Sequence, residues 1–110
     1  MNVQRIVVAD HHPLCRAGLA SLLSDRFAIG ELVQASDFPH TMAAIARSTG
    51  TTMVTVNMNL PGMNGIAGLR KLRADHPSLL LVVVAESRER VREPAHGLVE
   101  ALVLCGEHPL

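Results

Sequence analysis

The sequence predicts an α/β domain in which a parallel β-sheet is covered by helices on both faces. Apolar runs of strand length alternate along the 110 residues with segments whose apolar side chains recur at helical spacing. Glycine, proline, aspartate or serine separates these segments, as expected where helices and strands end. Alternating strands and helices favour parallel strands joined by right-handed crossovers, which places helices on both sides of the sheet.

The first strand and helix are marked by a β-branched run and by a proline. Residues 5–9 suit a short strand that is buried on both faces. A proline then opens a helix over 13–25, because proline is favoured in the first helical turn. We expect the apolar stripe of this helix at Cys15, Leu19 and Leu22.

The second strand and helix are predicted to meet at an aspartate. Residues 31–36 read as a short strand, and Asp37 can cap the next helix by accepting hydrogen bonds from its first N–H groups. Phe38, Met42 and Ile45 lie on one face of that helix and should pack on the sheet.

The third strand is expected over 52–56 and leads into a loop over 57–65. That loop ends in the turn dipeptide Asn64-Gly65. The next helix ends near His76-Pro77 and has an apolar face made of Ile66, Leu69 and Leu72.

The last part of the chain completes the alternation. Strands are predicted over 79–85 and 101–105. Between them, 87–97 reads as a weak, charged helix that Pro94 shortens or kinks, since proline inside a helix costs about 3 kcal/mol. Its alternating arginine and glutamate residues are typical of a solvated face.

Composition excludes several classes of function. Ten basic and ten acidic residues give a formal charge of zero, which argues against an electrostatic footprint for nucleic acid. Aromatic residues make up only 2% of the chain, so it lacks the stacking platforms of single-strand binders. No segment has the ~18 consecutive apolar residues of a membrane helix. Two cysteines make no disulfide framework, so we expect a reduced, cytoplasmic protein without membrane contact.

In a sheet of this kind, functional residues lie at the carboxyl ends of the strands. The positions to inspect are therefore 10–12, 57–65, 84–86 and 104–106.

Two of these segments carry a family resemblance. Residues 7–19, VVADHHPLCRAGL, resemble the opening of a response-regulator receiver domain of the NarL/LuxR type, which reads as an acid pair, His-Pro-Leu and Arg-x-Gly-Leu. Residues 54–65, VTVNMNLPGMNG, resemble the phosphoacceptor segment of that family, which ends in Leu-Pro-Gly-Met-Asp-Gly. The two segments stand at the family's spacing.

The resemblance implies one receiver-like domain over 1–110. Its expected fold is flavodoxin-like: a doubly wound, five-stranded parallel sheet of order 2-1-3-4-5. It also implies that the final helix is missing or truncated, because the chain stops at Leu110, where that helix would begin.

The chain departs from the family pattern at the phosphorylation site. Asn57 stands where the family has the aspartate that accepts a phosphoryl group, and a neutral carboxamide is not a nucleophile for that reaction. The acid pair that helps to hold Mg²⁺ is Asp10-His11 here, so one carboxylate remains from three.

Three further family positions differ. Val84 stands where a threonine or serine hydroxyl is expected, and Ala101 stands where the pattern has an aromatic switch residue. Leu104 or Cys105 replaces the lysine that pairs with the phosphoryl charge. The one lysine of the chain, Lys71, falls on the third predicted helix, far from this site.

These departures predict a degenerate phosphorylation-site pocket without a catalytic residue, metal or cofactor, lined by Asp10, His11, Asn57, Asn59, Val84, Leu104 and Cys105. His11 and His12 beside Asp10 could instead form a zinc site, although we favour a structural role for His12 at a helix start. Cys15 and Cys105 are expected to be two buried thiols. The alternative is a redox pair, which would require their Cα atoms to lie within ~7 Å of each other.

The first functional hypothesis is a non-enzymatic pseudo-receiver in signal transduction and transcription regulation. It would act through dimerisation, a partner protein or a small ligand, without aspartyl phosphorylation. The alternatives are a conventional phosphorylated receiver, using Asp10 or a deamidated Asn57, and a pure dimerisation adaptor. The resemblance implies DNA binding only through a C-terminal helix-turn-helix domain that this chain does not contain.

Overall fold

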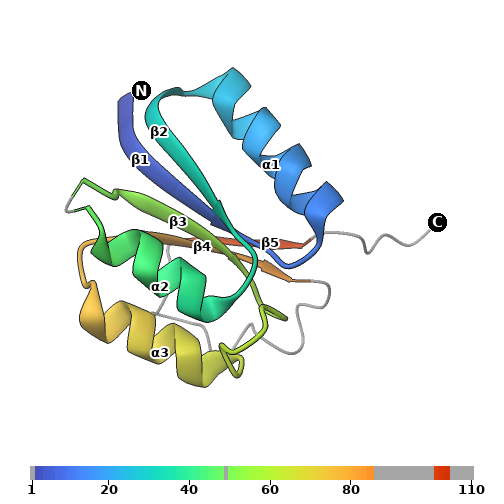
Figure 1. Cartoon of the computed structure of the whole chain (residues 1–110), viewed down its shortest axis with the longest axis vertical. Coiled ribbons are helices and arrows are strands. Elements are labelled where there is room, and N and C mark those ends of the chain that lie inside the picture. The colour runs from blue at the N-terminus through green and yellow to red at the C-terminus, as the bar shows by residue number, and fades with distance from the viewer. Residues whose placement is uncertain (1, 49, 86–100, 105–110) are drawn as a thin grey trace.

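The computed structural model describes residues 2–48, 50–85 and 101–104. In chain order the elements are β1 (Asn2–Ala9), α1 (Pro13–Arg26), β2 (Ala28–Ala35), α2 (Phe38–Ala46), β3 (Met53–Asn57), α3 (Ile66–Asp75), β4 (Leu80–Ala85) and β5 (Ala101–Leu104). Within these residues, parallel strands form one sheet in the order β2-β1-β3-β4-β5, as the family resemblance implies. Helix α1 covers one face of the sheet, and α2 and α3 cover the other (Figure 1).

Strand boundaries differ from the predicted ones. Strand β1 begins three residues before the predicted start, and β2 spans Ala28–Ala35 in place of 31–36. The cause is pairing between neighbours, because the β1–β2 register runs from Asn2↔Ala28 to Ala9↔Ala35 and extends both strands beyond their apolar runs. The predicted helix over 87–97 and the end of the chain, where the final helix is expected to be missing or truncated, lie outside the described residues.

The inner face of α1 is not the predicted stripe. Cys15 and Leu22 are exposed, whereas Ala20 is buried and Leu19 and Leu23 pack against β1. Leucines occur on both sides of this helix, so helical spacing alone does not decide which set faces the sheet. The expected burial of the Cys15 thiol is therefore wrong, and Cys105 lies outside the described residues.

The predicted start of α2 is confirmed. Asp37 is the N-cap, and its side chain accepts a hydrogen bond of 2.8 Å from the His40 N–H group. Phe38 and Ile45 are buried against the sheet, and Met42 packs beside them.

The larger core lies between the sheet and the two helices α2 and α3. Its strand residues are fully or almost fully buried: Val7, Ala9, Val54, Val56, Leu81 and Val83. On the α1 face the buried apolar pair is Ile6 and Val8, and their neighbours there are only partly buried. Among the described residues, the α1 face thus has the smaller cluster of buried apolar side chains.

A buried arginine in the middle of β1 joins several elements. Arg5 is 5% exposed. Its guanidinium donates hydrogen bonds of 2.7 Å to the Glu31 carboxylate, the Ala44 carbonyl oxygen and the Thr51 hydroxyl. One side chain therefore connects β1 with β2, with α2 and with the segment that leads into β3.

Two buried threonines give opposite predictions for the same substitution. The Thr55 hydroxyl has no hydrogen-bond partner in the described part of the chain, so Thr55→Val should raise the free energy of unfolding by about 1 kcal/mol. The Thr41 hydroxyl donates to the Asp37 carbonyl oxygen at 2.7 Å, so Thr41→Val should lower it by about 1 kcal/mol. Urea unfolding measures both, and effects of equal sign would contradict the assignment.

The cap of α2 predicts a dependence on pH. The His40 N–H group and then its imidazole hold the pKa of the Asp37 carboxyl below its ordinary value of 3.8. A lowered pKa in the folded state means that this stabilisation is present above that value and is lost as the pH falls through the folded pKa. Asp37→Asn keeps the cap acceptor but not the charge, so its melting temperature should fall less than that of the wild type between about pH 4 and pH 2.

Candidate functional site

The centre of the site is a contact between the ends of two neighbouring strands. Asp10 directly follows β1, and Asn57 is the last residue of β3, the strand that pairs with β1 through Ala9↔Val56. The Asn57 side-chain amide donates a hydrogen bond of 3.1 Å to the Asp10 carboxylate. Asp10 is only 4% exposed, so this amide contacts a buried charge.

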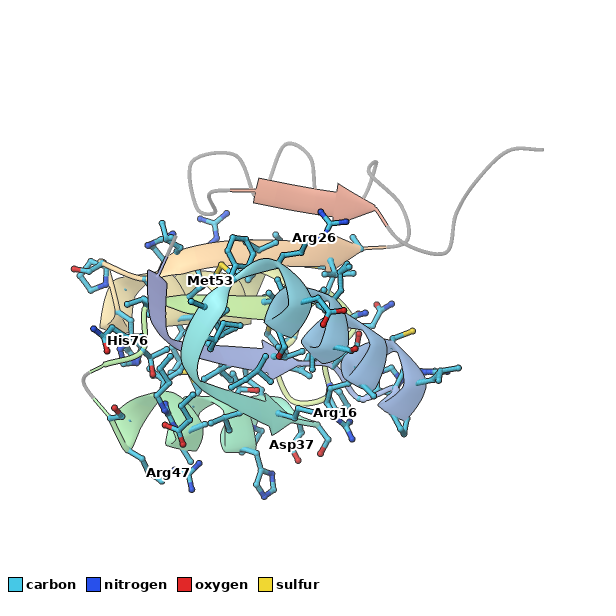
Figure 2. All side chains as sticks on the ribbon, turned by 90° about the horizontal axis from the view of Figure 1, so that it is seen from above. Arg16, Arg26, Asp37, Arg47, Met53 and His76 are labelled. Atoms are coloured by element: carbon cyan, nitrogen blue, oxygen red, sulfur yellow. The ribbon has the colours of Figure 1, made fainter. Side chains whose placement is uncertain are left out.

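The start of α1 supplies the other groups around Asp10. The His12 N–H group donates to the Asp10 carboxylate at 2.9 Å, and the His11 imidazole nitrogen lies 4.0 Å from the same oxygen. Arg16, labelled in Figure 2, donates to the Asp10 carbonyl oxygen at 2.9 Å and to the Gln34 side chain at 3.0 Å. The buried aspartate is therefore held by main chain and side chains of the domain itself.

His12 has the structural role that the sequence favours. It is the N-cap of α1, and its imidazole nitrogen accepts a hydrogen bond from the Cys15 N–H group at 3.4 Å. No group of three or more histidine, cysteine, aspartate or glutamate side chains is placed to hold a metal ion within the described residues.

The other end of the Asn57 amide fixes the loop after β3. The Asn57 side-chain oxygen accepts a hydrogen bond of 2.8 Å from the Asn59 N–H group. The main-chain carbonyl oxygen of Asn57 accepts one of 3.0 Å from the Leu60 N–H group. The amide thus donates toward the carboxylate and accepts from the loop, which agrees with the chemistry of each end.

Strand β4 contributes an apolar neighbour to the site. Val84 pairs in register with Asn57 and is half-buried, and its carbonyl oxygen accepts a hydrogen bond of 2.8 Å from the Met58 N–H group. Leu104, the last residue of β5, pairs with Ala85 of β4, which directly follows Val84. Cys105 lies outside the described residues. Lys71 forms its ion pair with Asp75 on α3.

The sequence did not predict that Met63 packs the loop onto Gly68 of α3. A side chain at Gly68 would collide with Met63, which is 2% exposed at the turn before the helix. The turn itself is predicted correctly, since Asn64 and Gly65 both have a φ of 60°. The loop borders a hollow of about 400 Å³ lined by Met58, Asn59, Leu60, Gly62, Asn64 and Gly65.

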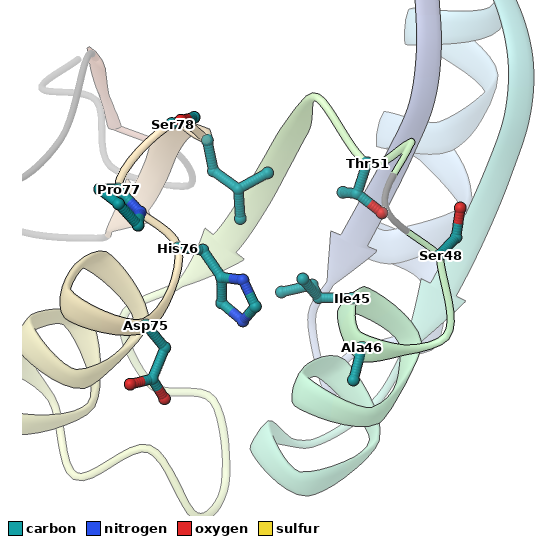
Figure 3. Close-up of a pocket in the computed structure, with 9 residues that line it drawn as sticks. Ile45, Ala46, Ser48, Thr51, Asp75, His76, Pro77 and Ser78 are labelled. Carbon is teal, nitrogen blue, oxygen red and sulfur yellow. The ribbon is translucent and has the colours of Figure 1, made fainter.

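A second hollow of about 370 Å³ lies at the opposite, amino end of β3 and β4 (Figure 3). The His76 side chain, at the end of α3, points into it toward Ile45 of α2. The other lining residues are Ala46, Ser48, Thr51, Asp75, Pro77, Ser78 and Leu79. This hollow is separate from the Asp10–Asn57 contact.

The Asp10–Asn57 arrangement does not suit Mg²⁺. That cation is held by carboxylate and other oxygen ligands. Here the two carboxylate oxygens of Asp10 already accept hydrogen bonds from the His12 N–H group and the Asn57 amide. The neutral Asn57 amide adds neither a second acid nor a nucleophile to the single carboxylate of Asp10.

No helix in the described part of the chain is long and apolar enough to cross a membrane.

Comparison with known proteins agrees with the sequence resemblance. Residues 6–101 match the family model of the response regulator receiver domain. The chain is 27% identical over 86 residues to the glycerol metabolism activator of Pseudomonas putida, covering 78% of this chain and 39% of that protein. It is 33% identical over 82 residues to the nitrate/nitrite response regulator protein NarL of Escherichia coli K12, covering 74% and 38%.

A solved structure shows the same fold. RcsB from Salmonella enterica serovar Typhimurium, bound to promoter rprA in the presence of phosphomimetic BeF3⁻, superimposes with a TM-score of 0.81 at 19% identity. The match covers 96% of this chain and 62% of that one. The chain thus spans about two fifths of the curated relatives that it matches.

The Asp10–Asn57 contact predicts a loss of stability when the amide is removed. Asn57→Ala takes a donor from a buried carboxylate, so it should lower the free energy of unfolding by about 1.5–3 kcal/mol, the range for hydrogen bonds to charged groups. Asn59 is the matched control, because it contributes its backbone N–H group and its side chain is exposed. Asn59→Ala should stay within about 0.5 kcal/mol, and equal losses in urea unfolding would contradict a specific role for Asn57.

Proposed function

Because the chain belongs to the response regulator receiver domain family, we propose that it is an atypical receiver domain of a signal-transduction protein. Its output does not require aspartyl phosphorylation. The observation that carries this proposal is the 3.1 Å hydrogen bond from the Asn57 amide to the buried Asp10 carboxylate. By its resemblance to the motif over 54–65, Asn57 stands at the position at which receiver domains have their phosphoacceptor aspartate.

The chemistry of the amide supports this reading. A carboxylate can attack a phosphoryl donor, but the lone pair of an amide nitrogen is delocalised and the amide oxygen is neutral. In this site the amide also donates a hydrogen bond to Asp10, where a phosphorylated site would place a cation between two acids. The hydrogen bond stabilises the Asp10 charge without a metal ion.

The neighbouring side chains support the same conclusion. Val84 beside Asn57 has no hydroxyl that could donate to a phosphoryl oxygen. Lys71 is paired with Asp75 on α3, so the chain's single lysine is engaged away from the site. A phosphoryl group at Asn57 or Asp10 would lack the cationic and hydroxyl partners that stabilise developing charge.

The proposed output is non-enzymatic and acts through self-association, a partner protein or a small ligand at the altered pocket. That pocket comprises Asp10, His11, Asn57, Asn59 and Val84, with Leu104 and Cys105 at its β5 side. The proposed working unit is the domain over 1–110 in the cytoplasm. Control of transcription, as suggested by the promoter-bound relative, would need a DNA-binding domain joined to this one.

Mass spectrometry tests the proposal directly. The chain is incubated with acetyl phosphate and Mg²⁺, and its intact mass is compared before and after. The wild type should show no increase of about 80 Da, the mass that a phosphoryl group adds, because the nucleophile is missing. Asn57→Asp supplies a carboxylate at the same position and is the matched comparison.

A gain of about 80 Da by the wild type would contradict the proposal and favour a conventional phosphorylated receiver. Fragmentation would then distinguish Asp10 from a deamidated Asn57 as the acceptor. The melting temperature is also measured against a set of metabolites. A domain with a ligand-binding pocket should show a shift in melting temperature with its ligand, whereas a pure dimerisation adaptor should show none.

A further inference from the structure

The chain contains four asparagines, and only one of them is followed by glycine. They are Asn2, Asn57, Asn59 and Asn64, and Gly65 follows the last. An asparagine side chain can react with the main-chain nitrogen of the next residue, because attack on the side-chain carbonyl carbon closes a five-membered ring. Glycine has no Cβ to hinder that approach. The sequence therefore singles out the Asn64–Gly65 step.

The nitrogens that would attack the two other asparagines of the loop over 57–65 are held by hydrogen bonds. The Met58 N–H group, which follows Asn57, donates to the Val84 carbonyl oxygen at 2.8 Å. The Leu60 N–H group, which follows Asn59, donates to the Asn57 carbonyl oxygen at 3.0 Å. Each nitrogen must give up this bond before it can turn toward the preceding side chain, and that loss slows the reaction.

The structure leaves the Asn64–Gly65 step without such protection. Among the described residues, neither the Gly65 N–H group nor the Asn64 side-chain amide has a hydrogen-bond partner, and Asn64 is exposed. Both residues have a φ of 60°, a backbone conformation that glycine and asparagine adopt more readily than other residues. The turn that joins β3 to α3 (Figure 1) therefore favours the same two residues that react with each other.

The charge environment of the step also favours the reaction. Gly65 is the N-cap of α3, where no side chain accepts a capping hydrogen bond, and the first turn of α3 contains no acidic residue. Attack on the Asn64 amide places negative charge on its oxygen. A charge of this sign is stabilised at the amino end of a helix.

We propose that Asn64 is a site of spontaneous covalent modification. The Gly65 nitrogen bonds to the Asn64 side-chain carbonyl carbon, the C–N bond of the amide breaks, and ammonia leaves with the proton of the Gly65 N–H group. Water then opens the succinimide ring. Opening at the side-chain carbonyl gives aspartate, and opening at the main-chain carbonyl gives isoaspartate. The reaction consumes one water and releases one ammonia, and it is independent of the proposed function.

The two products have different effects on the loop. Aspartate leaves the main chain unchanged and adds a negative charge before α3, which the helix dipole favours. Isoaspartate carries the main chain through the β-carbon and so adds one atom at a residue whose carbonyl oxygen accepts the Ala67 N–H group at 3.3 Å. It should therefore disturb the start of α3 and the hollow of about 400 Å³ that Asn64 and Gly65 help to line.

Tryptic digestion after incubation in neutral or mildly alkaline buffer tests the site. Trypsin cleaves after Arg47 and Arg70, so residues 48–70 form one peptide in which three asparagines are compared directly. Electron-transfer fragmentation locates each new acid and separates aspartate from isoaspartate. Conversion at Asn64 should be about tenfold or more faster than at the other two, whose attacking nitrogens are hydrogen-bonded. Alkaline buffer should accelerate it, because the Gly65 nitrogen must lose its proton.

The same experiment in urea separates the effect of the structure from that of the sequence. Unfolding breaks the hydrogen bonds of the Met58 and Leu60 N–H groups, so the rate at Asn64 relative to the other two positions should fall. An unchanged ratio would mean that the glycine alone sets the selectivity, and it would overturn the protective role of these hydrogen bonds.

Two variants remove the reaction and a third supplies one product. Asn64→Gln should block conversion, because attack would have to close a six-membered ring. Asn64→Gly lacks the amide and adopts a positive φ without strain, so it serves where the glutamine disturbs the turn. Asn64→Asp should melt no lower than the fresh wild type at neutral pH, whereas wild type that has accumulated isoaspartate should melt lower.

Two results would overturn the proposal. One is a wild-type chain that forms no acid at position 64 during prolonged alkaline incubation. The other is conversion of Asn57 or Asn59 at the rate of Asn64. Exchange of an amide for an acid changes the mass far less than a phosphoryl group does, so neither result affects the test of phosphorylation.

Discussion

Strand β1 has one buried charged residue in its middle and a second directly after its last residue, and the separate partners of these two residues position the elements around the strand. Arg5 is 5% exposed and Asp10 is 4% exposed, with an apolar stretch between them. A charge that leaves water is tolerated only when it is paired and hydrogen-bonded. Arg5 meets this condition through β2, α2 and the segment before β3. Asp10 accepts hydrogen bonds from the start of α1 and from the end of β3.

The pairing at Asp10 links the fold to the proposed function. A site that binds a cation needs acidic oxygens whose charge is not yet balanced. In this chain the end of β3 presents an amide that donates to Asp10, so folding itself satisfies the carboxylate. The same amide that stabilises the Asp10 carboxylate is unsuited to nucleophilic attack. Structural stability and phosphoryl transfer therefore place opposite demands on position 57.

How much could be predicted from sequence follows from the kind of interaction involved. The strand order was predictable from the family resemblance. The Asp37 cap was predictable from local pattern, and the approach of Asp10 to Asn57 from strand ends meeting at one edge. The inner face of α1 was not, since leucines on two sides make helical spacing ambiguous. The Arg5 cluster joins residues up to 46 positions apart, and a local pattern does not reveal such contacts.

The first turn of helix α1 is bonded directly to the site. His12 caps the helix and donates its N–H group to Asp10, and Arg16 binds the Asp10 carbonyl oxygen one turn later. Leu14 lies between these two residues, on the outer side of the same turn. A ligand that changed the hydrogen bonds of Asp10 would therefore act on the first turn of α1. Thermodynamic linkage makes the relation reciprocal, so anything that displaced this turn would change the affinity of the pocket for such a ligand.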